Sequence, residues 1–96
     1  AAPNFSAGAK YANVTPEFNS VCLRSRIQFV LDVAACNHVD TLILGAFGCG
    51  VFGQNPKEVA IIMHNLLPGY PFKTVVFAIP DKNHVNYRAF AEVFSA

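Results

Sequence analysis

Residues 42–53 read LILGAFGCGVFG, and this stretch decides how the chain folds. An apolar run reaches Gly45 and opens into nine residues that hold four glycines, and Pro56 then begins a helix. Glycines at the carboxyl end of a buried strand let backbone N–H groups approach a bound group closely, and phosphate is the usual such group. The stretch therefore predicts a strand, a phosphate-binding loop and a helix, in that order.

Two phenylalanines, Phe47 and Phe52, lie inside this loop. An exposed loop has little structural need for large rings. Together with the glycines, these rings predict a ligand that carries both phosphate and a ring, such as a sugar.

Helix signals stand on both sides of the loop. Thr15-Pro16-Glu17 supplies a capping side chain, a proline at the first helical position and an acid, which predicts a helix running to about Asn37. Its expected apolar stripe repeats at three- and four-residue steps and comprises Phe18, Cys22, Ile27, Val30, Leu31 and Ala34. Residues 55–58 repeat the start signal with Asn and Glu at capping-box spacing. The stripe of that second helix comprises Val59, Ile62, Met63, Leu66 and Leu67.

Two strands and a final helix complete the pattern. Residues 41–44 and 73–80 are apolar runs without alternation, as expected for parallel strands that are covered on both faces. Residues 85–94 predict a helix that turns Phe90, Val93 and Phe94 inward, and residues 1–4 resemble the end of a further strand. The alternation of strands and helices along the chain predicts an α/β fold, with a mostly parallel sheet between helix layers. In such a fold ligands bind beyond the carboxyl ends of the strands.

Length and composition set limits on this fold. The chain has 96 residues, of which 53% are hydrophobic and 14% charged, and its net charge is +1. A chain this apolar predicts a face intended for more protein, because an ordinary soluble domain is roughly 25% charged. Two complete strands are few for an independent α/β domain, so we expect residues 1–96 to be part of one domain that continues on the amino-terminal side.

Composition also excludes several partners. No basic stripe is present, which argues against direct DNA or RNA binding, and no apolar run is long enough to span a membrane. Three cysteines, Cys22, Cys36 and Cys49, have no CxxC spacing and predict reduced thiols in a cytoplasmic protein.

Other readings of the same residues are weaker. Residues 48–53 formally match the dinucleotide fingerprint G-x-G-x-x-G, but Asn55 and Pro56 place Gly53 outside the helix that should contain it. No Gly-Lys-Ser/Thr follows, which excludes a P-loop. The three histidines lack ligand spacing, so no metal site is expected. Cys49 has no predictable base beside it and is expected to pack behind the loop rather than act as a nucleophile.

The segment LILGAFGCGVFGQNPKEVA, residues 42–60, closely resembles the signature of the microbial poly(ADP-ribose) glycohydrolases, a branch of the macrodomain fold. Its flanks agree, with AAPN at residues 1–4 and VVFAIPD at residues 75–81. The resemblance covers nearly the whole chain. It implies a three-layer α/β/α macrodomain-like fold of which this chain is the carboxyl-terminal portion.

The resemblance also implies a binding site for ADP-ribose or poly(ADP-ribose), with no cofactor. In it the glycine loop would hold the two phosphates and border the distal ribose, against which Phe52 would pack. The implied ligand-binding residues are Gly45, Ala46, Phe47, Gly48, Cys49, Gly50, Val51 and Phe52. Phe77 and Asp81 would lie toward the adenosine, and Asn4 could border the sugar.

One part of the family pattern does not occur in this chain. The catalytic segment, a Gly-Gly-Gly stretch followed by Gln-Glu-Glu, belongs to the amino-terminal half of the family fold. Glycoside cleavage needs a carboxylic acid near the bond, and Glu17, Glu58 and Glu92 belong to helices. We therefore predict no catalytic residue here, weak or no binding by the chain alone, and a partner in the amino-terminal half of the same domain or in self-association. The alternatives are an ADP-ribose or nucleotide binding module without catalysis, and part of an NAD(P)- or flavin-dependent oxidoreductase.

Overall fold

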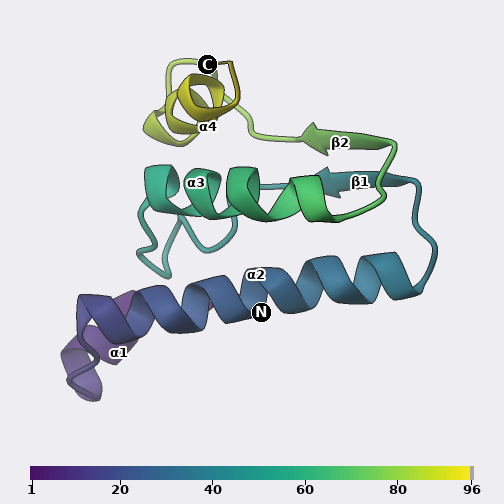
Figure 1. Ribbon diagram of the computed structural model, residues 1–96. Coiled ribbons are helices and arrows are strands. Elements are labelled where there is room, and N and C mark those ends of the chain that lie inside the picture. Colours follow the sequence, from purple (N-terminus) through teal and green to yellow (C-terminus); the bar gives the residue numbers. More distant parts are fainter. Residues whose placement is uncertain (96) are drawn as a thin grey trace.

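The computed structural model describes residues 1–95 of the chain. The elements, in order, are helix α1 (Phe5–Tyr11), helix α2 (Pro16–Cys36), strand β1 (Thr41–Leu44), helix α3 (Pro56–Leu66), the 3₁₀ turn η1 (Leu67–Gly69), strand β2 (Thr74–Phe77) and helix α4 (Val85–Ser95). Helix α3 packs against both α2 and α4, and the two strands lie beside it (Figure 1).

The predicted helix starts are confirmed. The Thr15 side chain accepts a hydrogen bond from the Phe18 amide, and Pro16 is the first residue of α2. The Asn55 side chain accepts from the Lys57 and Glu58 amides at the start of α3. Each cap satisfies backbone donors that the first turn of a helix leaves unpaired.

The two strands form a parallel sheet, as predicted, with Thr41 opposite Thr74 and Leu44 opposite Phe77. The expectation that both faces are covered is wrong for the described residues. Leu42, Leu44 and Phe77 pack against the core, whereas Ile43 and Val76 on the opposite face are 68% and 45% exposed. The apolar runs thus have only one face buried against α2, α3 and α4.

The core lies between the covered face of the sheet and the three longer helices. It comprises Leu23, Ile27 and Leu31 from α2, Val59, Ala60, Ile62 and Met63 from α3, and Phe90 from α4. The stripe of α3 is confirmed, and so are the inward positions on α4. The stripe of α2 is wrong in part, because residues four apart from Asn19 to Leu31 face the core and Phe18 is 59% exposed.

Residues 1–4 form no strand, which corrects the expectation for this segment. Asn4 instead caps the short helix α1, which the sequence did not predict. Gly8 at its centre is a poor helix former, and the chain is held there by the Val14 amide, which donates to the Gly8 carbonyl.

Large apolar side chains remain exposed on α2 as well as on the sheet. Besides Phe18, they are Val21, Phe29 and Val33. Among the residues described, no helix is both long enough and apolar enough to cross a lipid bilayer.

Candidate functional site

The glycine loop, residues 45–53, leaves the sheet where both strands end. Leu44 and Phe77 are the last paired residues, and the Ala78 amide donates to the Leu44 carbonyl at 2.7 Å. Both strands therefore end at the same edge of the sheet, and parallel sheets bind ligands at this edge. This confirms the predicted position of the loop.

Two turns give the loop its shape. The Cys49 amide donates to the Ala46 carbonyl, and the Gly53 amide donates to the Gly50 carbonyl, each at 3.0 Å. Gly48 and Gly53 both have φ of +74°. A Cβ on Gly48 would lie 2.8 Å from side-chain carbons of Ala2 and Gln54, and one on Gly53 would clash with the Ser6 hydroxyl. These two glycines are therefore required by the fold.

Gly45 and Gly50 differ from them. Neither has a positive φ, and a Cβ on either would meet no atom within 4 Å. The fold would accept a side chain at both positions. Packing therefore does not explain why these two positions are glycine.

Several loop amides have no protein partner. Across residues 1–95, six N–H groups of the loop donate to no protein acceptor, and they belong to Gly45, Ala46, Gly48, Gly50, Val51 and Phe52. Gly50, Val51 and Phe52 are consecutive and exposed. Unpaired consecutive N–H groups in a turn attract anions.

The two loop phenylalanines have different roles. Phe47 packs against the hydrophobic core together with Ala46 and Cys49, so its ring does have a structural function, contrary to expectation. Phe52 is 36% exposed and Val51 is 90% exposed. Of the two rings, that of Phe52 is the one that does not pack against the core.

The Cys49 thiol is held behind the loop, as predicted. Its Sγ donates to the Phe47 carbonyl at 3.6 Å, and burial raises the pKa of the thiol from 9.0 to about 11. Because the thiolate is the reactive form, this environment suppresses nucleophilic chemistry at neutral pH.

The raised pKa gives a testable prediction. At pH 8, iodoacetamide should label the exposed Cys36 readily and leave Cys49 largely unmodified, with Cys49 labelling rising only as the pH approaches 11. Peptide mass spectrometry over a pH series would measure both sites in one sample, and guanidinium-unfolded protein provides the control. Rapid labelling of Cys49 at pH 7 in the folded chain would contradict this assignment.

Asp81, Phe77 and Asn4, which were expected at the edges of the site, have different surroundings. Asp81 and Ala46 line one depression of about 280 Å³, together with Ile79, Pro80, His84 and Asn86. Phe77 belongs to an aromatic cluster, with its ring centroid 4.5 Å from that of Phe94 and 5.2 Å from that of Phe90. The Asn4 side-chain oxygen accepts from the Ala7 amide at 3.0 Å.

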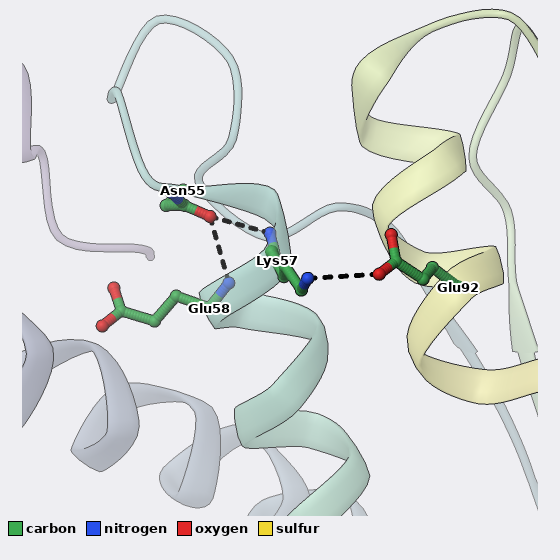
Figure 2. Close-up of polar contacts among 4 residues, drawn as sticks. All are labelled: Asn55, Lys57, Glu58 and Glu92. Atoms are coloured by element: carbon green, nitrogen blue, oxygen red, sulfur yellow. Dashed lines mark hydrogen bonds and ion pairs between the residues drawn. The ribbon is translucent and has the colours of Figure 1, made fainter. Parts of the chain in front are cut away.

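Figure 2 shows how two of the carboxylates near the start of α3 lie. Glu92 pairs with Lys57 at 3.1 Å, joining α4 to α3, and Glu58 extends away from them beside the Asn55 cap. Glu58 accepts from the Ser20 hydroxyl of α2 at 2.6 Å. These carboxylates thus make contacts between helices.

Other ligand classes find less support. Because α3 begins at Pro56 with Asn55 as its cap, Gly53 lies outside the helix, against the dinucleotide fingerprint. Among residues 1–95, no group of three or more His, Cys, Asp or Glu side chains could hold a metal ion.

Two buried residues near the loop escaped the sequence analysis. Asn19 and Gln54 are 4% and 3% exposed and hydrogen-bond to each other. Gln54 directly precedes a helix cap, and Asn19 lies four residues after a cap, positions at which polar side chains are usually solvated. No local pattern indicated that they meet.

Comparison with solved structures identifies similar proteins. At 38% identity and a TM-score of 0.86, 98% of this chain matches 40% of a poly(ADP-ribose) glycohydrolase from Deinococcus radiodurans that was crystallised with ADP-ribose. The apo form of that enzyme matches with a TM-score of 0.87, and a mutant of the Thermomonospora curvata enzyme matches at 39% identity with a TM-score of 0.80. No protein-family model and no curated protein sequence matches the chain.

The chain therefore spans about two fifths of the length of these relatives. The predicted resemblance and the α/β, macrodomain-like fold class are both confirmed. Over nearly all of its length, this chain is similar in sequence and fold to part of the microbial poly(ADP-ribose) glycohydrolases.

Proposed function

We propose that this chain provides the diphosphate-binding part of an ADP-ribose pocket, with the glycine loop holding the two phosphates. The observation that carries this proposal is the exposed run of N–H groups from Gly50 to Phe52, none of which has an acceptor within residues 1–95. Hydrogen bonds from such groups to an ionised phosphate are about twice as strong as neutral ones. The relatives crystallised with ADP-ribose support the choice of ligand.

In this proposal different residues contact different parts of ADP-ribose. Gly45 and Gly50 leave space for the diphosphate, since a side chain at either position would stand in open space beside the backbone. The Phe52 ring would cover the distal ribose. Ala46 and Asp81, which share a depression at the end of β2, would lie toward the adenosine.

We propose further that the whole protein hydrolyses the ribose–ribose bonds of poly(ADP-ribose), and that this chain is its carboxyl-terminal portion. The catalytic acid would come from residues outside this chain, because Glu58 and Glu92 bind Ser20 and Lys57. The amino-terminal portion of the same domain would cover the exposed face of the sheet around Ile43 and Val76. That surface supports the proposal, since exposed apolar patches mark contacts with further protein.

Calorimetric titration with ADP-ribose tests the ligand, with the chain alone and with the amino-terminal portion supplied. With the amino-terminal portion present, ADP-ribose should bind, and adenosine, which lacks the diphosphate, should bind far more weakly. Equal affinity for adenosine would contradict the role of the loop. Binding of NADH without binding of ADP-ribose would favour the oxidoreductase alternative.

A further inference from the structure

The end of the glycine loop is joined to α2 by a buried pair of side-chain amides. Asn19 Nδ2 donates to Gln54 Oε1 at 2.8 Å, and Gln54 Nε2 donates to Asn19 Oδ1 at 2.9 Å. Gln54 Nε2 also donates to the Pro3 carbonyl at 2.8 Å. Among residues 1–95, no buried side-chain nitrogen or oxygen lacks a partner. Amides buried this deeply are destabilising unless they are paired, so these bonds specify a single position for Gln54.

The amino-terminal segment supports the loop from the other side. The Ser6 amide donates to the Phe52 carbonyl at 3.1 Å. Gly48 and Gly53 lie so close to Ala2 and Ser6 that neither glycine has room for a Cβ. Segment 2–6 is thus packed against the loop at Gly48, Phe52 and Gly53.

Gln54 also closes the loop through its backbone. Its amide donates to the Gly48 carbonyl at 2.9 Å, so Gly48 and Gln54 enclose the five residues between them. Gly50, Val51 and Phe52 lie within that enclosed stretch. A displacement of Gln54 would therefore move the stretch that carries the exposed N–H groups.

We infer that Pro3, Ser6, Asn19 and Gln54 form a loop bracket that fixes the conformation of residues 50–52 and of their unpaired N–H groups before any ligand binds. Asn19 and Gln54 are positioning residues, because they are buried behind the loop and act through its backbone. Only the affinity measurement below rests on the proposed function. A loop released from the bracket would populate other conformations, and its apparent affinity would fall in proportion to the fraction that stays competent.

Hydrogen exchange of the unmodified chain tests the bracket without a ligand. The Ser6, Gly53 and Gln54 amides, which come from two distant segments, should exchange through one opening with the same free energy. Independent exchange of the Ser6 amide would overturn the inference.

A variant tests the bracket by hydrogen exchange and also by the affinity for ADP-ribose. Gln54→Met keeps the length of the side chain but leaves Asn19 and Pro3 without their partner. We expect exchange at Ser6 and Gly53 to quicken about tenfold and ADP-ribose to bind about tenfold more weakly. Gln28→Met makes the same change at an exposed position of α2 and should alter neither quantity. Phe90→Leu, in the core beside Phe77, lowers stability away from the loop and should leave exchange at Ser6 coupled to that at Gly53.

The outcomes separate this inference from the proposed function. Coupled exchange in a chain that binds no ADP-ribose even with the amino-terminal portion supplied supports the bracket and overturns the proposed ligand. Unchanged exchange and unchanged affinity in Gln54→Met overturn the bracket and leave the ligand standing. If Gln54→Met does not fold, Asn19→Ser, which removes the reciprocal bonds from the α2 side, decides by the same two measurements.

Discussion

Gly50→Val should weaken ADP-ribose binding about 100-fold while leaving the stability of the chain nearly unchanged. The valine side chain would occupy the space that a diphosphate needs beside the Gly50, Val51 and Phe52 amides. Losing two charge-assisted hydrogen bonds would account for an effect of this size, which corresponds to about 2.7 kcal/mol. Calorimetry should be done with the form of the protein that binds ADP-ribose, with or without the amino-terminal portion.

The structure makes this a clean test because nothing in the fold opposes the change. A Cβ at Gly50 meets no atom within 4 Å, and the residue does not have a positive φ. The free energy of unfolding, measured by thermal unfolding, should therefore change by no more than about 0.5 kcal/mol. Gly69→Val is the matched control, since Gly69 in η1 is equally open and far along the chain from the loop. Unchanged affinity in a folded Gly50→Val would refute the assignment of the loop.

Gly48→Val should have the opposite profile, with a large loss of stability. Gly48 has φ of +74°, a conformation that is unfavourable for a β-branched residue by about 1–2 kcal/mol. Its Cβ would also lie 2.8 Å from Ala2 and Gln54 carbons, and overpacking adds about 1–3 kcal/mol. We expect a total of about 2–5 kcal/mol, which lowers the melting temperature of a domain this size by about 10 °C or more.

Circular dichroism melts of Gly48→Val, Gly50→Val and Gly69→Val in parallel would measure this difference. Only Gly48→Val should melt at a clearly lower temperature. Ala2→Gly in the Gly48→Val background removes one of the two clashing carbons and should restore part of the loss. If Gly48→Val melts at the same temperature as the unmodified chain, the turn from Ala46 to Cys49 is not formed as described.

The two predictions together divide the glycines by cause. Gly48 and Gly53 satisfy the geometry of the loop, and Gly45 and Gly50 leave it open on the outer side. Packing therefore requires two of the four loop glycines and does not account for the other two.

Local signals in the sequence determined most of the elements. The caps at Thr15 and Asn55 and the proline that follows each one place the starts of α2 and α3. Apolar runs between turn residues locate β1 and β2, and the glycines locate the loop. These features depend on residues within about one helical turn of each other, so the sequence carries them directly.

Faces and long-range partners were decided only by the tertiary structure. Helix α2 is apolar on more than one side, so its pattern alone could not tell that Leu23 and not Phe18 faces the core. Gln54 meets Asn19 across 35 residues and Pro3 across 51, and Phe47 turns inward onto a core built from three helices. Such contacts arise from packing between segments far apart in the chain. The position of the loop is therefore predictable from the sequence. Which of its residues stay exposed depends on the distant segments that pack against it.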